Sequence, residues 1–268
     1  DFLARNRNIR KDALLVLAYK TTPYEIFQSD SPMALSSRGL VDLLRVQEQT
    51  LGVYKPVSCD EFLGKLATPG IDPVVPQVTV TRQQGRSIVT LDGMAVFRQN
   101  RWVGSLNELE SRGFHWLSSQ NRIGGLLVLD NPLPDLDYVS LDVIHFDSRT
   151  RPRIEGNHLI MDINVKTILN LYDQGGLVNE QTLYDIGRLE ALADQEIERQ
   201  IRACIDKAQQ LNGDVLGWGQ KVYRYYPQVW ITLEKNWYEI FPQVEANITV
   251  QAEIRRQGQI NLPFKIRR

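Results

Sequence analysis

The first quarter of the chain alternates strand-like and helix-like patterns. A continuous apolar run at 13–19 predicts a strand. Thr22 followed by Pro23 predicts the start of a short helix, because proline fits the first helical position. Periodic apolar positions predict two further helices, one after Ser37 and one over 60–66. This part of the chain therefore has α/β character.

Beyond residue 76 the pattern changes to the alternation of antiparallel strands. The alternating segments that predict strands are 78–81, 87–91, 94–98 and 124–129. Asp92-Gly93 predicts a turn between the second and the third of them. A helix is predicted over 107–117, with Asn107 as its cap and Glu110 at the spacing of a capping box.

The last part of the chain combines strands with one long helix. Three strands are predicted, over 138–148, 150–155 and 157–170. A flexible stretch is expected at 174–176, followed by a helix over 186–211 whose apolar residues recur at steps of three and four. Asn212-Gly213 suits the left-handed end of that helix. The alternation at 248–254 predicts a half-buried antiparallel strand.

Two proline-containing segments divide this pattern. Residues 72–76 carry prolines at both 73 and 76 and are expected to form a stiff, extended linker. Asn-Pro-Leu-Pro at 131–134 interrupts the chain a second time. We therefore expect the remainder of an N-terminal α/β domain over 1–75, a small α+β middle domain over 76–134, and a C-terminal domain of antiparallel sheet plus helices over 135–268.

The predicted fold class is α+β, with three mixed α/β domains of which the first is truncated. Its sheets are expected to be mostly antiparallel and packed with helices, and the long helix belongs to the C-terminal domain. The 268 residues are 43% hydrophobic and 24% charged, so the chain has enough apolar material for real cores. The longest apolar run spans 13–18 and is much shorter than the roughly 20 residues of a membrane-spanning helix.

Charge and cysteine content restrict the possible functions further. The 31 Lys and Arg residues nearly balance the 32 Asp and Glu residues, which argues against a nucleic-acid partner. The two cysteines, Cys59 and Cys204, lie far apart in the sequence and form no CxxC pair. We expect two buried or partly buried thiols; one long-range disulfide is the alternative.

Candidate catalytic groups do not converge in the sequence. His115, His145 and His158 show no metal-ligand spacing, and neither a GxSxG elbow nor a GxxxxGK[ST] loop occurs. Gly217-Trp218-Gly219 lacks the third glycine of a dinucleotide fingerprint and is interpreted as part of a turn that caps a second helix. No catalytic, cofactor-binding or metal-binding residue is therefore predicted, and no cofactor is expected.

Carboxylate pairs and an aromatic cluster have structural explanations. Asp60/Glu61 and Glu108/Glu110 lie at predicted helix starts, where negative charge is favourable. The aromatic residues near the C-terminus are Trp218, Tyr223, Tyr225, Tyr226, Trp230, Trp237, Tyr238 and Phe241. Such residues can stack on a sugar or a base, but no basic stripe runs between them. We therefore expect them to pack in or over the core.

The carboxy-terminal sequence resembles the Ger(x)C family, the C subunits of bacterial spore germinant receptors. Its order is Asp-Val-Leu-Gly-Trp-Gly at 214–219, Tyr-Pro at 226–227, Trp230, Trp-Tyr-Glu-Ile-Phe-Pro at 237–242 and Arg-Arg-Gln-Gly at 255–258. Upstream, Asp-Gly-Met-Ala-Val-Phe-Arg at 92–98 and Trp-Val-Gly-Ser-Leu at 102–106 with Glu110 resemble a second family segment. Phe-Leu-Ala-Arg at 2–5 resembles a third, with Asn6 in place of the family's acid.

The resemblance implies a lipoprotein on the outer face of the spore inner membrane. Its lipid anchor is expected on a cysteine upstream of residue 1, since the chain begins without Met and within a helical pattern. The parent would be membrane-bound through this anchor, whereas the present fragment would be soluble. The implied partners are the A and B membrane subunits of the receptor. The family has no known catalytic residues to transfer to this chain.

Three functions remain open at this point. The first is a non-catalytic interaction module that contacts the membrane subunits and is needed for nutrient-triggered germination. The second is a germinant-binding module, with a small molecule in a cleft between the middle and last domains. The third is an enzyme, a hydrolase acting on cortex peptidoglycan, which the absence of catalytic motifs disfavours.

Overall fold

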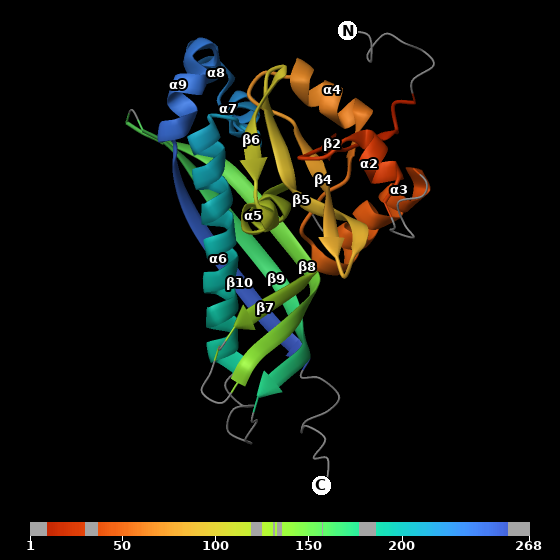
Figure 1. The fold of residues 1–268 in the computed structure, drawn as a ribbon. Helices are drawn as coiled ribbons and strands as arrows, with labels where there is room; N and C mark the ends of the chain where they lie inside the picture. The colour runs from red at the N-terminus through yellow and green to blue at the C-terminus, as the bar shows by residue number, and fades with distance from the viewer. Residues whose placement is uncertain are drawn as a thin grey trace.

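The computed structural model describes residues 10–29, 37–118, 125–130, 132, 136–156, 158–176 and 186–256. Two long strands, β8 (Leu136–Glu155) and β9 (His158–Gly176), run along the molecule, and helix α6 (Ile186–Leu211) lies beside them (Figure 1). The N-terminal elements gather against one half of this assembly. The predicted α+β class, with mostly antiparallel sheets packed with helices, is confirmed.

The C-terminal sheet has the order β10-β9-β8-β7, with β7 at Leu126–Asp130 and β10 at Glu245–Arg256. Strands β7, β8 and β9 are antiparallel neighbours. Strand β10 pairs with β9 in parallel, so the antiparallel pairing expected for 248–254 is wrong. The reason is the connection: the chain leaves β9, crosses through α6 and the shorter helices, and returns in its original direction, as parallel pairing requires.

Strands β8 and β9 are longer than their sequence pattern predicts. The expected break between 148 and 150 is wrong, because β8 continues through it and absorbs irregularities as register shifts near Ser140 and Val143. The flexible stretch expected at 174–176 is also wrong, because it pairs with the start of β8. Gly175 lies under the Tyr138 ring, where a Cβ would be 2.3 Å from a ring carbon. The absence of a side chain at Gly175 permits this close contact between β9 and the Tyr138 ring.

The second sheet has the order β2-β4-β5-β6. Its strands are β2 (Leu17–Ala18), β4 (Val74–Gln83), β5 (Arg86–Arg98) and β6 (Arg101–Leu106). The linker expected at 72–76 is wrong: Val74 and Val75 are buried and pair with Val96 and Ala95 in β5. Proline is tolerated here because a register shift interrupts the ladder just after Pro76.

The turn expected at Asp92-Gly93 is also wrong, because both residues lie inside β5. Gly93 has a φ of 86°, and a Cβ there would be 2.1 Å from the carbonyl oxygen of Leu106. Gly93 thus permits a local distortion of β5 at the point where Leu106 of β6 approaches closely.

The N-terminal elements match their predicted positions closely. The apolar run at 13–19 forms β1 (Leu14–Leu15), which pairs with β3 (Val57–Ser58), and then β2, which pairs with β4 in parallel. The helices are α2 (Pro23–Phe27), α3 (Ser37–Val46), its π-helical continuation η1 (Gln47–Leu51), and α4 (Cys59–Ala67). Thr22 and Glu25 form a capping box at the start of α2, which confirms that helix start.

Helix α5 (Glu108–Ser118) packs directly against α6. Its predicted capping box is confirmed: the Asn107 N–H donates to the Glu110 carboxylate at 2.7 Å, and the Glu110 N–H donates to Asn107 Oδ1 at 3.0 Å. A Cβ on Gly113 would be 2.0 Å from the carbonyl oxygen of Gln200 in α6. The two helices therefore cross in backbone contact, which only glycine permits at this position.

Helix α6 buries one face over its whole length and confirms the predicted long helix. Its buried residues are Leu189, Ala193, Ile197, Gln200, Ile201, Cys204, Ile205 and Ala208. The helix ends at Asn212, whose φ of 51° gives the left-handed conformation expected there. The following elements are α7 (Trp218–Tyr225), α8 (Pro227–Leu233), η3 (Glu234–Asn236), α9 (Trp237–Ile240) and η4 (Phe241–Gln243).

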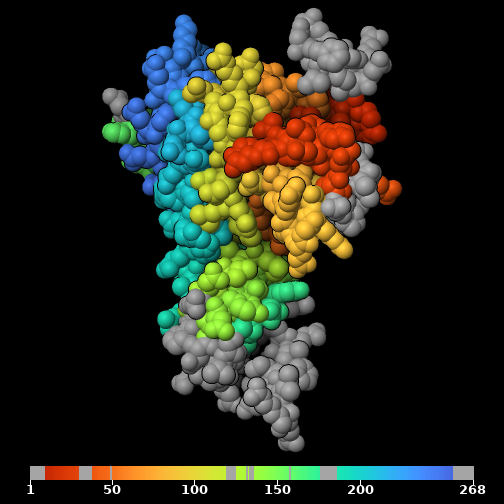
Figure 2. Space-filling view, in the orientation of Figure 1, coloured from red at the N-terminus to blue at the C-terminus, as the bar shows by residue number. Residues whose placement is uncertain are grey.

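One hydrophobic core connects elements from all parts of the chain. It includes Val57 before β4, Phe114 in α5 and Ile201 in α6. On the face shown in Figure 2, the N-terminal elements (red to orange) lie against the second sheet (yellow), and α6 (cyan) follows on the other side. The division into 1–75, 76–134 and 135–268 stays a prediction.

Candidate functional site

A buried carboxylate, Asp214, organises the start of α7. Its Oδ1 accepts a hydrogen bond from the backbone N–H of Trp218 at 2.9 Å. Its Oδ2 accepts from the backbone N–H of Gly219 at 2.8 Å and from the indole N–H of Trp237 at 3.0 Å. The carboxylate therefore caps the helix, where the helix dipole also favours negative charge. The predicted cap at 214–219 is confirmed.

A second buried carboxylate, Asp72, belongs to the N-terminal part of the chain and is hydrogen-bonded to the same segment. Its Oδ2 accepts from the N–H of Asp214 at 2.8 Å, and its own N–H donates to the Asp214 carbonyl at 2.8 Å. Its Oδ1 accepts from the N–H of Gln99 at 3.2 Å and from the Tyr238 hydroxyl at 3.0 Å. These contacts, which we call the Asp72–Asp214 junction, join residues that lie far apart in the sequence.

Two glycines allow the chains of the junction to approach each other. A Cβ on Gly219 would lie 2.6 Å from the Cα of Gly70 and 2.6 Å from the Trp230 ring. The N–H of Gln220 donates to the Gly70 carbonyl at 2.9 Å. Gly217 has a φ of 64°, so the turn interpretation of Gly217-Trp218-Gly219 is confirmed.

Aromatic rings cover the junction. Trp230 and Trp237 meet edge to face with centroids 5.2 Å apart, and Trp218 meets Phe241 at 5.6 Å. All four rings are buried, so core packing is confirmed for this half of the predicted cluster. The tyrosines at 223, 225 and 226 differ, because they lie on the outer side of the α7 region and remain exposed.

The electrostatics of the junction follow from its burial. Burial raises the pKa of Asp214 to about 7, against the opposing effect of its three N–H donors. Burial likewise raises the pKa of Asp72, and it raises the pKa of the Tyr238 hydroxyl together with the nearby Asp72 charge. Each carboxylate oxygen already accepts a hydrogen bond from the chain itself. The arrangement therefore joins distant segments of the chain through hydrogen bonds to both carboxylates.

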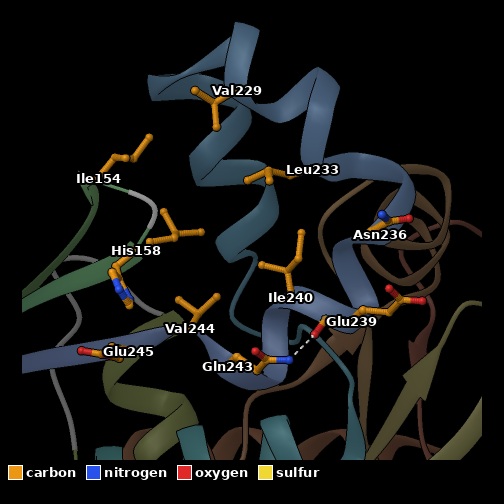
Figure 3. A pocket seen from close by; sticks show the side chains of 12 residues that line it. Ile154, His158, Val229, Leu233, Asn236, Glu239, Ile240, Gln243, Val244 and Glu245 are labelled. Atoms are coloured by element: carbon orange, nitrogen blue, oxygen red, sulfur yellow. Dashed lines mark hydrogen bonds between the residues drawn. The ribbon is translucent and has the colours of Figure 1, made fainter.

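An open groove lies between the α8–α9 segment and the turn that joins β8 to β9 (Figure 3). Its volume is about 750 Å³. We call it the apolar groove, and its lining residues are Ile154, Gly156, His158, Leu159, Val229, Leu233, Asn236, Glu239, Ile240, Gln243, Val244 and Glu245. In Figure 3 the side chains of Leu233, Ile240 and Val244 surround the same space. The groove is therefore an apolar surface with a polar border.

The three histidines lie apart. His115 is buried in α5, where burial lowers its pKa to about 4, and its Nδ1 has no hydrogen-bond partner among the described residues. His145 belongs to β8, and His158 lies at the border of the apolar groove. In the part of the chain that the structure describes, no group of three or more His, Cys, Asp or Glu residues is placed to hold a metal ion.

The cysteines and the paired carboxylates have the structural roles expected of them. Cys59 and Cys204 are buried free thiols, as predicted, and burial raises the pKa of the Cys204 thiol. Glu61 lies in the first turn of α4 and forms ion pairs with Lys55 and Lys65, each at 3.0 Å. Glu110 belongs to the capping box of α5.

Two groups of residues escaped the sequence analysis. Asp72 was assigned to a linker, and no local signal reveals that its partners Asp214 and Tyr238 follow more than a hundred residues later. Basic side chains at 149, 151 and 166 were also overlooked. The signal available for Arg149 and Arg151 was the alternation of charged residues from 147 to 151, which places these two side chains on one face of a strand.

Comparison with a solved structure gives the class of fold. The crystal structure of the GerBC protein superposes with a TM-score of 0.71 and 17% sequence identity, covering 94% of this chain and 72% of that chain. None of the described helices is long and apolar enough to cross a membrane. The superposition shows that this chain shares its fold with the GerBC protein.

Two family models match the sequence. The model "Spore germination B3/GerAC like, C-terminal" matches residues 92–258, and the model "Spore germination protein N-terminal domain" matches residues 1–80. The chain belongs to the GerAC-like family of spore germination proteins, which confirms the resemblance found in the sequence. Asp72 lies in one matched segment and Asp214 in the other, so the junction connects the two.

Curated relatives come from Bacillus subtilis (strain 168). Spore germination protein KC is 25% identical over 99% of this chain, and spore germination protein YndF is 21% identical over 97%. The putative spore germination protein YfkR is 19% identical over 96%. This chain spans 69%, 63% and 66% of their respective lengths. These relatives support a role in spore germination.

Proposed function

We propose that the chain is part of the non-catalytic C subunit of a spore germinant receptor, and that it acts by contacting the A and B membrane subunits. The observation that carries this proposal is the apolar groove, which leaves aliphatic side chains of α8 and α9 accessible at one end of the molecule. Apolar and aromatic surface with a polar border is the usual composition of a protein–protein interface. Its occupant in the receptor is an amphipathic segment of a membrane subunit.

The place of action in this proposal is the outer face of the spore inner membrane, with the parent held there by a lipid anchor upstream of residue 1. Family membership and the resemblance of 214–219 and 237–242 support it. A contact of the apolar groove with a membrane subunit would place the anchored protein beside that subunit.

Co-purification from spore membranes tests the contact. Val229→Asp and Leu233→Asp place charge in the apolar groove, and Val128→Asp is the matched control on the exposed face of β7. We expect each groove variant of the full-length parent to recover at least about tenfold less membrane subunit, because an unpaired charge is desolvated at the interface. The control should behave like the wild type. Wild-type parent that never co-fractionates with the other subunits would contradict the proposal.

A germinant-binding function is the second candidate, because a volume of about 750 Å³ is in the range of small-molecule sites. One space between the middle and last parts, beside His115 and Trp116, measures about 10 Å³, which is too small for an amino acid or a sugar. Germinant binding in a cleft between these parts stays a prediction. Thermal shift with amino acids and sugars separates the candidates: stabilisation of about 1–3 kcal/mol at 10–100 times Kd favours germinant binding.

A peptidoglycan hydrolase is disfavoured by the chemistry of the buried acids. Asp72 and Asp214 are the carboxylates with raised pKa values that lie together, and both are occupied by donors of the chain. General acid catalysis requires a proton that reaches the substrate. We therefore expect a peptidoglycan zymogram of the refolded chain to remain blank; a clearing band would revive the enzymatic hypothesis.

A further inference from the structure

A charged cleft lies where β8 extends beyond its pairing with β7. Strand β7 pairs with β8 only over residues 138–142 in the described structure, and α7 packs against the stretch that follows. Two adjoining hollows of about 320 and 380 Å³ meet there and share the residues at 147, 149 and 151. We call this site the basic cleft; its charged residues are Asp147, Arg149, Arg151, Lys166, Lys221 and Arg224.

The charges of the basic cleft are unbalanced. Five cationic side chains face one carboxylate, and that carboxylate, Asp147, is already paired with Arg149 at 2.9 Å. Among the described residues, the other four cations have neither an ion pair nor a side-chain hydrogen bond. Further along the same strand, Arg153 has a partner in Asp162 at 2.7 Å. Because the chain as a whole carries a net charge of −1, this local excess of positive charge is unusual.

A half-buried lysine adds to this indication of an anionic ligand. Lys221 lines the cleft from α7, and burial lowers the pKa of its ammonium. A bound anion would stabilise the charged form of this side chain.

We propose that the basic cleft binds a phosphate group, carried by a free small phosphate or by a lipid headgroup. Arginine offers paired N–H donors that match phosphate oxygens, and lysine adds compact positive charge. A dianion matches the excess of four positive charges better than a single carboxylate does. The hollow of about 380 Å³ accommodates one such group. The site is separate from the apolar groove, so it does not depend on the proposed receptor contacts.

Titration calorimetry with inorganic phosphate tests the site. Arg151→Gln combined with Lys166→Gln removes two exposed cleft cations, and Arg82→Gln combined with Arg101→Gln removes two exposed cations from the second sheet. We expect the cleft variant to lose at least about tenfold in affinity, because it loses charge-assisted hydrogen bonds. The control should keep wild-type affinity and wild-type salt dependence. Equal binding by the two variants, or no binding by the wild type, would overturn the proposal.

Vesicle sedimentation distinguishes the two sources of phosphate. Phosphatidylcholine vesicles are compared with vesicles that contain phosphatidylglycerol, each with wild type and both double variants. Binding to the anionic vesicles that the cleft variant loses and the control retains assigns the site to a lipid headgroup. Phosphate binding without vesicle binding assigns it to a free phosphate. Vesicle binding that falls equally in both double variants reflects general charge and would contradict a lipid site.

Discussion

The Asp72–Asp214 junction and the basic cleft differ in whether their charged groups have partners within the chain. At the junction, two buried carboxylates have every oxygen occupied by N–H or O–H donors of the chain. In the basic cleft, four cations lack such partners among the described residues. Part of the sequence that carries the family resemblance, at 214–219 and 237–238, belongs to the junction. The comparison teaches that this part of the recognisable sequence maintains the fold, whereas the unpaired cations lie outside it.

Removing the central carboxylate should have the largest effect. Asp214→Ala leaves three buried N–H donors without an acceptor, and we expect the free energy of unfolding to fall by about 3–5 kcal/mol. Urea denaturation measures the loss. Asp206→Ala, an exposed aspartate on α6, is the matched control and should change it by less than about 0.5 kcal/mol. A loss below about 1 kcal/mol in Asp214→Ala would contradict a structural junction.

The pH dependence of stability separates two buried groups with opposite shifts. The lowered pKa of His115 makes stability fall as pH drops from about 6.5 to about 4, because only the unfolded chain gains the proton there. The raised pKa of Asp214 acts in the opposite sense, since stability falls as pH rises from about 3.8 through about 7. In wild type the two effects should largely cancel.

Asp214→Asn removes one of these two effects. The free energy of unfolding of this variant should rise by roughly 3 kcal/mol more than that of wild type between about pH 4 and pH 6.5, because the opposing titration of Asp214 is removed and that of His115 remains. Urea midpoints at several pH values give the slope. Asp206→Asn serves as the control and should follow wild type. An unchanged slope in Asp214→Asn would show that the carboxylate titrates normally.

Two glycine substitutions should change the free energy of unfolding in opposite directions. Gly219→Ala places a Cβ 2.6 Å from Gly70 and from the Trp230 ring, so we expect it to lower the free energy of unfolding by about 1–3 kcal/mol. Gly64→Ala meets nothing within 4 Å inside helix α4 and should raise it by about 0.5–1 kcal/mol. Thermal unfolding of both variants compares them. Similar effects in the two would mean that the chains at the junction are loosely packed.

The basic cleft should contribute little to stability. Arg151→Gln combined with Lys166→Gln removes exposed cations without ion pairs among the described residues, so the free energy of unfolding should change by less than about 0.5 kcal/mol. Urea denaturation without added phosphate checks this. A loss comparable to that of Asp214→Ala would remove the distinction between the two regions.

Local patterns predict local structure well in this protein. The capping residues Asn107 and Glu110, the extent of α6 and the left-handed Asn212 all follow from spacing within a few residues. Features that depend on distant partners do not. The parallel direction of β10 is set by the crossover helices, and the burial of 74–75 is set by pairing with β5.

Prediction of the three sites from local sequence patterns has the same limit. Asp72 has the sequence context of a linker, and only the folded chain brings it to Asp214 and Tyr238. The basic cleft requires the register that places Asp147 opposite Lys166 and the packing of α7 on β8. The apolar groove likewise combines α8, α9 and the β8–β9 turn. Each site is assembled from segments whose proximity no local pattern encodes.

A double-mutant cycle between Asp72 and Tyr238 tests the central claim most directly. These residues belong to the two separately matched segments of the chain, and a single hydrogen bond of 3.0 Å joins their side chains. Urea denaturation of Asp72→Ala, Tyr238→Phe and the double variant gives the coupling free energy. We expect a favourable coupling of about 1–2 kcal/mol, as for a buried hydrogen bond to a charged group. Effects that add within about 0.3 kcal/mol would contradict a junction that holds the two segments together.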